Sequence, residues 1–148
     1  MKPLAAVAVV AWAGLAGAGL AQGNAQYRAR LSPVPLDVVM QATIAGSGTA
    51  TATLTGSRLA IAGTFSGLRS PATIARVHVA DKGLRGAPVF DLTVSASTSG
   101  AISGTLDLTP AQVEDLTKSR FYIQVHSEKA PEGNLWGWLL PPSETRKY

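Results

Sequence analysis

The chain has 148 residues, of which 13 are basic and 9 acidic, with a formal net charge of +4 and no cysteine. The lack of cysteine excludes disulfides, cysteine-ligated zinc, a thiol nucleophile and a covalently attached c-type haem. The 15 glycines, nine prolines and low charged fraction of 15% favour an all-β domain. The basic residues are scattered, so the charge does not predict nucleic-acid binding.

Residues 1–21 have the pattern of a signal peptide. Lys2 is followed by an uncharged apolar stretch at 4–21, and both Gly19-Leu20-Ala21 and Gly23-Asn24-Ala25 fit the small-x-small rule for cleavage. We therefore expect a secreted or periplasmic protein with no membrane span left after cleavage. The alternative is an uncleaved anchor, since an apolar stretch of this length is just sufficient to span a bilayer.

The next segment, residues 22–44, is interpreted as a lead-in followed by the first strand. Pro33 and Pro35 indicate an irregular stretch over 27–35, and apolar alternation predicts a strand over 38–45. Glycine-rich turns then bound two alternating runs, which predict a hairpin with its turn at Gly56-Ser57 and strands over 49–55 and 58–66.

The second half of the chain continues with short strands and one helix. Thr109-Pro110-Ala111-Gln112 is typical of a helix start, because threonine caps, proline fits the first turn and glutamine reaches back to the cap. Strands are predicted over residues 73–80, 89–94, 102–108, 121–127 and 135–140, with a polar turn over 128–134 and a flexible tail over 141–148.

Together these elements predict an all-β fold. About eight short strands bounded by turns are typical of a two-sheet antiparallel sandwich or a flattened Greek-key barrel, here with one short helix near residues 109–119.

Three stretches, in order, resemble the chordin-type (CHRD) domain. They are the hairpin within residues 50–67, the strand Ile74-Ala75-Arg76-Val77-His78, and the run from Phe121 to Ser127 followed by residues 130–137. The resemblance covers residues 45–140, and it implies an extracytoplasmic β-domain without an established chemical activity. The chain departs from the family pattern twice, with Arg76 in place of the first histidine and Trp136 in place of the terminal arginine.

His78 and His126 are the only histidines, and strand alternation places both on the polar side of their strands. One interpretation is a copper or zinc site completed by Asp81 or Glu128. The other is a structural cluster in which both rings share a hydrogen-bond network. Arg76 disfavours both a cation and a charged imidazole. We therefore predict a polar cluster without metal, and two histidines that are neutral near pH 7.

Catalysis finds little support in the sequence. Ser127, His126 and Asp81 have the residue types of a hydrolase triad, but neighbouring residues of a strand point to opposite faces. The chain contains no nucleophile elbow, phosphate loop or dinucleotide-binding glycine pattern. We expect a protein that is not an enzyme and needs no cofactor.

Trp136 and Trp138 lie two residues apart and therefore project from the same side of the closing strand. They either pack against the domain or form an aromatic surface for a protein or glycan partner. Leu135, Gly137 and Leu139 would then be directed inward. Taken together, these features favour an exported, non-catalytic binding or structural module. Its candidate binding residues are His78, His126, Arg76, Tyr122, Trp136 and Trp138.

The signal-peptide interpretation predicts the mass of the mature protein. Mass spectrometry of the natively expressed chain should find an N-terminus at Gln22 or Gln26, because both follow a small-x-small site. An intact Met1 on a chain that fractionates with membranes would contradict cleavage.

Overall fold

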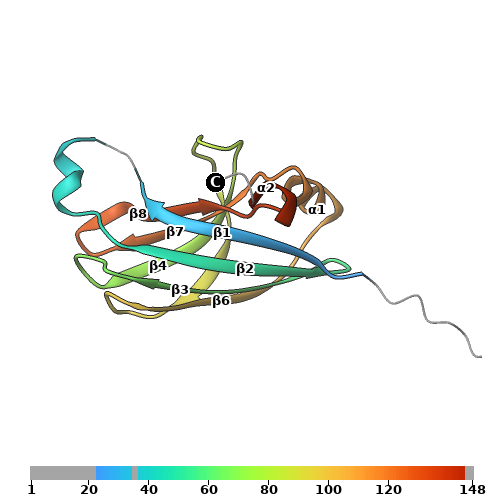
Figure 1. Cartoon of the computed structure of the whole chain (residues 1–148), viewed down its shortest axis with the longest axis horizontal. Coiled ribbons are helices and arrows are strands. Elements are labelled where there is room, and N and C mark those ends of the chain that lie inside the picture. The colour runs from blue at the N-terminus through green and yellow to red at the C-terminus, as the bar shows by residue number, and fades with distance from the viewer. Residues whose placement is uncertain (1–22, 35–36, 146–148) are drawn as a thin grey trace, which may run out of the picture.

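The computed structural model describes residues 23–34 and 37–145. Eight antiparallel strands close into a barrel in the order β1-β2-β3-β6-β5-β4-β7-β8 (Figure 1). The predicted all-β class is confirmed, and the architecture is a barrel rather than a two-sheet sandwich. The strands are β1 (Ala25–Pro33), β2 (Ser47–Thr55), β3 (Arg58–Ser66), β4 (Ala72–Val79), β5 (Pro88–Val94), β6 (Gly100–Asp107), β7 (Phe121–Ser127) and β8 (Ala130–Trp138).

The predicted signal peptide over residues 1–21 lies outside the described part of the chain. Within residues 23–34 and 37–145, no helix is long and apolar enough to cross a membrane.

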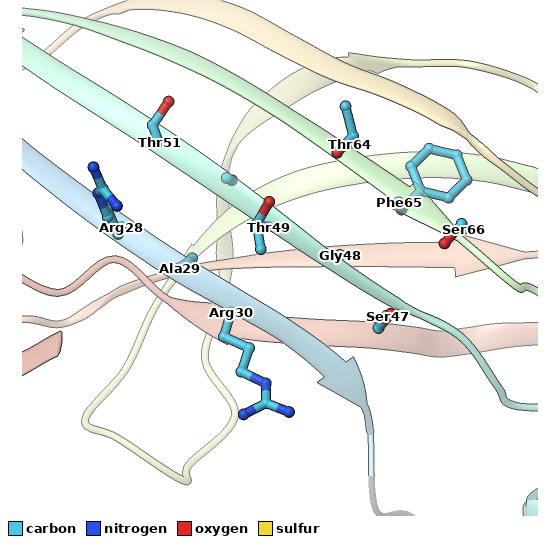
Figure 2. Close-up of a pocket in the computed structure, with 11 residues that line it drawn as sticks. Arg28, Ala29, Arg30, Ser47, Gly48, Thr49, Thr51, Thr64, Phe65 and Ser66 are labelled. Carbon is cyan, nitrogen blue, oxygen red and sulfur yellow. The ribbon is translucent and has the colours of Figure 1, made fainter. Parts of the chain in front are cut away.

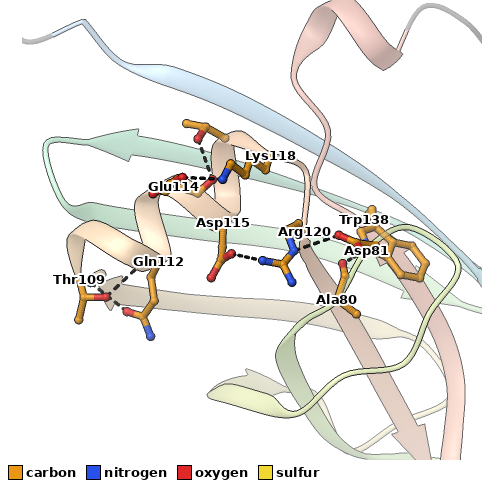
Figure 3. Close-up of polar contacts among 10 residues, drawn as sticks. Ala80, Asp81, Thr109, Gln112, Glu114, Asp115, Lys118, Arg120 and Trp138 are labelled. Carbon is orange, nitrogen blue, oxygen red and sulfur yellow. Dashed lines mark hydrogen bonds and ion pairs between the residues drawn. The ribbon is translucent and has the colours of Figure 1, made fainter.

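The strand order contains a Greek key. Strands β4, β5 and β6 are consecutive neighbours, and the chain then returns across them so that β7 lies beside β4. Helix α1 (Pro110–Thr117) forms this return, close to the short helix α2 (Pro142–Thr145) (Figure 1). The α1 start is as predicted, because the Thr109 hydroxyl accepts from the Gln112 N–H at 3.2 Å and the Gln112 side chain accepts from the Thr109 N–H at 2.9 Å (Figure 3).

The predicted first strand is wrong. Residues 38–45 do not form a strand but contain the short 3-10 helix η1 (Val39–Ala42), and the carboxylate of Asp37 accepts a hydrogen bond from the Met40 N–H at its start. Val38 and Val39 are 79% and 83% exposed, so this apolar run fills no core.

The first strand lies instead in the stretch that we expected to be irregular. In β1, Tyr27, Ala29 and Leu31 are buried in the core and alternate with exposed residues. This alternation allows β1 to pair with β2 on one side and β8 on the other, and burial of its inward side chains outweighs the effect of the prolines at its end.

The closing strand is longer than predicted. It begins at Ala130, so the polar turn expected over 128–134 shrinks to the two residues between β7 and β8. Gly133 makes this possible: its φ is +132°, and a Cβ there would meet the Gln124 side chain at 2.0 Å. Within the stretch predicted to be a flexible tail, Pro142–Thr145 form the short helix α2, and residues 146–148 are outside the described residues.

The barrel interior follows the predicted alternation. Val77, Phe121, Ile123 and Val125 are fully buried, with no measurable exposure. Val79, which the same alternation along β4 directs inward, is only half-buried, because it is the last residue of β4, where the chain leaves the sheet.

Truncating the core should measure this packing. Ile123→Ala is expected to lower the free energy of unfolding by about 2–5 kcal/mol, because it removes buried methyl and methylene groups and leaves a cavity. Urea unfolding followed by circular dichroism measures the change. A loss below about 0.5 kcal/mol, typical of exposed positions, would contradict the inward position of Ile123.

Candidate functional site

An aromatic cluster covers the outer side of β4, β7 and β8. We call His78, Tyr122, Trp136 and Trp138 the aromatic face. The strand register assembles it, since His78 lies opposite Tyr122 on the β4–β7 pair, and Tyr122 lies opposite Trp138 on the β7–β8 pair. All four side chains therefore point away from the core that Ile123 and Leu135 fill on the other side.

The four rings contact one another. His78 stacks on Tyr122 with 4.9 Å between ring centroids and 19° between planes. The Tyr122 and Trp138 centroids are 4.8 Å apart, and Trp136 meets Trp138 edge-on, also at 4.8 Å. These separations are typical of favourable aromatic pairs, so the rings hold one another in fixed orientations.

The loop between β4 and β5 covers one end of the aromatic face. The Gly86 carbonyl accepts hydrogen bonds from His78 Nδ1 at 2.9 Å and from the Tyr122 hydroxyl at 3.3 Å, and the Gly86 N–H donates to the same hydroxyl at 3.0 Å. His78 and Tyr122 are therefore only 8% and 1% exposed, whereas the two tryptophans are half-buried.

The start of the same loop is anchored by a second set of contacts. Arg120 bridges the Asp81 carboxylate at 3.0 Å and the Asp115 carboxylate of α1 at 2.7 Å, and the Trp138 indole N–H donates to the Ala80 carbonyl at 3.1 Å (Figure 3). Helix, loop and tryptophan are thus tied together, which orients the Trp138 ring.

His126 does not join His78 in one network. On the β4–β7 pair, His126 lies opposite Ile74, whereas His78 lies opposite Tyr122. His126 and Tyr122 are four residues apart along β7, which corresponds to about 13 Å of strand. The Nδ1 atom of His126 donates to the Pro131 carbonyl at 2.8 Å, whereas His78 uses Gly86. The shared network that we expected is therefore wrong, because the register separates the two rings along the sheet.

His78 is held in one tautomer. Because Nδ1 faces a carbonyl oxygen, it carries the proton and leaves Nε2 as an acceptor. This Nε2 atom is buried and has no hydrogen-bond partner in the described protein. Burial lowers the pKa of His78, and the nearby charges of His126, Arg76 and Arg85 add to this effect, while the bond to Gly86 opposes it.

Arg76 has a different role from the one we expected. Its guanidinium is paired with Asp91 of β5 at 2.8 Å, so it is not a lone cation beside the histidine. The neutral state predicted for His78 has support, but its principal cause is burial and not the arginine.

The four residues of the suggested copper or zinc site are not gathered by the fold. Asp81 is held by Arg120, and Glu128 is exposed in the turn between β7 and β8. Among the described residues, no group of three or more histidine, cysteine, aspartate or glutamate side chains could hold a metal ion.

The suggested triad is not assembled either. Ser127 is fully buried, and its hydroxyl accepts a hydrogen bond from the Asn134 side chain at 2.8 Å. His126 points to the opposite side of the strand, as alternation predicts.

The pair of tryptophans has the predicted orientation. Leu135 and Leu139, which flank the pair in sequence, are fully buried. Gly137, between the two tryptophans, faces β1, where a Cβ would meet the Arg30 carbonyl oxygen at 2.2 Å. β8 is not an edge strand, because β7 and β1 pair with it on both sides.

A second candidate binding surface was not predicted from the sequence. A hollow of about 790 Å³ lies on β1, β2 and β3. Its lining includes Arg28 and Arg30 of β1 and Thr49 and Thr51 of β2 (Figure 2). The signal was present as alternation in the run Tyr27-Arg28-Ala29-Arg30-Leu31, which places both arginines on the outer side of one strand.

The described residues form an antiparallel Greek-key barrel with one crossover helix and an aromatic outer face. The CHRD domain family model matches residues 27–139, from β1 through β8, and the chain belongs to the CHRD domain family. Comparisons with curated proteins and with solved structures give no match.

The lowered pKa of His78 predicts how stability depends on pH. The unfolded state binds a proton near the ordinary pKa of 6.5, whereas the folded state binds it only at lower pH. The contribution of His78 is therefore present above pH 6.5 and is lost as the pH falls through this value toward the folded pKa.

Thermal unfolding between pH 7.5 and pH 5 tests this linkage, with roughly this interval chosen to bracket the histidine range. The melting temperature of the wild type should fall on acidification, and His78→Gln, which cannot titrate, should show a shallower fall. Equal slopes for the two proteins would contradict the linkage.

Proposed function

We propose that this CHRD-domain protein is an exported, non-catalytic binding module that contacts its partner through the aromatic face. The observation that carries the proposal is the fixed arrangement of the four rings. Tryptophan and tyrosine are enriched among residues that dominate binding energy, because they offer a large contact area at little entropic cost.

The aromatic face is ordered before any partner arrives. The rings pack against one another, and Gly86 and Ala80 hold the polar atoms of Tyr122 and Trp138 through the β4–β5 loop. Little side-chain entropy is therefore lost on binding, and the half-buried tryptophans keep accessible area for a partner. Ring surfaces of this kind pack well against the apolar C–H faces of sugars, so we favour a glycan over a protein partner.

The proposal that the module is non-catalytic is supported by how its reactive side chains are engaged. Ser127 is buried on the core side and bonded to Asn134, while Asp81 is paired with Arg120. Neither is available beside His126, so these groups do not serve as nucleophile and base.

Export is supported by family membership and by the composition of the N-terminal segment. CHRD domains are typical of extracellular proteins, and the apolar run at 4–21 followed by small residues is the pattern of a cleaved leader. The compartment that we propose is the periplasm or the cell exterior.

Removing one tryptophan should weaken binding without unfolding the barrel. Trp136→Ala is expected to reduce affinity about 30-fold, which corresponds to about 2 kcal/mol, the usual size of a binding hot spot. The measurement is retention of the labelled mature protein on an array of immobilised plant, algal and bacterial polysaccharides. The protein is then titrated with the polysaccharide that retains it.

The matched control is Val38→Ala, which truncates an apolar side chain that is 79% exposed and lies outside the barrel strands, in the segment between β1 and β2. This variant should bind like the wild type, and Trp136→Phe should retain more affinity than Trp136→Ala. Failure of every polysaccharide on the array to retain the protein, or undiminished binding by a folded Trp136→Ala protein, would contradict the proposal.

A further inference from the structure

The hollow on β1, β2 and β3 is lined by two arginines of β1. Arg28 and Arg30 occupy successive outward positions of β1, about 7 Å apart along the strand. None of the three strands contains an aspartate or glutamate. Two like charges on one strand without a compensating carboxylate repel each other, and a bound anion relieves this repulsion.

In the part of the chain that the structure describes, Arg28 and Arg30 differ from the other two arginines that lie on strands, Arg58 and Arg76, in having no ion pair. Arg58, Arg76 and Arg120 are each paired with an aspartate. Over the described residues, neither Arg28 nor Arg30 has a carboxylate within ion-pair distance, so both guanidinium groups are available to a ligand.

Threonine residues occupy the neighbouring positions on β2 and β3. The β1–β2 register places Thr51 opposite Arg28 and Thr49 opposite Arg30, and Thr64 of β3 lies opposite Thr49. These side chains line the same hollow (Figure 2). A guanidinium group forms two parallel hydrogen bonds to a carboxylate or sulfate, while threonine hydroxyls bond equally well to sugar hydroxyls.

The hollow lies next to the aromatic face, because β1, which carries the two arginines, is the direct neighbour of β8, which carries the two tryptophans. β1 pairs with β8 through Ser32 and Trp136 and again through Arg28 and Leu140. Arg30 lies midway between these two contacts, level with Trp138 on the neighbouring strand. In Figure 2 its side chain extends on the side of β1 away from β2, which is the side of β8.

We infer that the ligand is an acidic polysaccharide, with its sugar rings on the aromatic face and its carboxylate or sulfate groups on Arg28 and Arg30. The inference rests on the proposed function and adds the chemical class of the glycan. Two arginines with hydroxyls and tryptophans beside them suit a sugar polymer better than a nucleic acid, which requires a dense basic surface.

The test compares polygalacturonate with the neutral polymer dextran as probes for the mature, full-length protein in affinity electrophoresis. The wild type should bind polygalacturonate and not dextran, and added sodium chloride should weaken the binding, because the contacts are ionic. Arg28→Gln/Arg30→Gln should lose affinity about tenfold or more, since two charge-assisted bidentate contacts are removed.

The matched control is Arg58→Gln, which removes an exposed arginine of the same sheet that is already paired with Asp107. It should bind polygalacturonate like the wild type. Undiminished binding by Arg28→Gln/Arg30→Gln, equal retention by dextran, or equal affinity for a DNA duplex would overturn the inference.

Trp136→Ala separates this inference from the proposed function. Loss of binding in both the arginine and the tryptophan variants supports both. Loss in the tryptophan variant alone would overturn the role of the arginines and leave the binding module intact. Loss in the arginine variant alone would overturn the aromatic face as the contact surface.

Discussion

The structure depends on β1 closing the barrel between β2 and β8. β1 pairs with β2 through seven residues and with β8 at Ser32, Pro33 and Arg28. Closure removes the exposed sheet edges that would otherwise present unpaired N–H and C=O groups. It also buries Tyr27, Ala29 and Leu31 in the common core. Because all eight strands then share one closed network of hydrogen bonds, the positions of outward side chains follow from strand register alone.

The same register creates the two candidate contact surfaces. Alternation directs Trp136 and Trp138 outward on β8, and closure places Arg28 and Arg30 on the strand beside them. The β4–β5 loop covers Tyr122 and His78, and Arg120 holds that loop against α1. Burial under this cover explains why the pKa of His78 is lowered. Stability near pH 6 and the order of the aromatic rings therefore have the same structural cause.

Elements with local signals were predictable. The hairpin turn at Gly56-Ser57, strand β3 and strand β7 follow the predicted bounds, and α1 starts at the predicted cap. In each case the deciding physics acts over a few residues, as turn geometry, capping or alternation. The first strand was different, because residues 38–45 have apolar alternation but no partner, whereas the run after Ala25 finds two partner strands. Pairing over long sequence separations decided between the two segments, and a local pattern carries no information about it.

The sequence by itself determined the all-β class, the CHRD resemblance, the outward direction of Tyr122, His126 and the tryptophan pair, and the inward direction of Ile123. These follow from a period of two along each strand, which is a property of the backbone. Only the tertiary structure decided that the two histidines are separated along the sheet, that Asp81 is paired with Arg120, and that Arg28 and Arg30 lie on the strand next to the tryptophans. The reason is that alternation specifies the face of a side chain but not its height along the neighbouring strand, which barrel closure and register set.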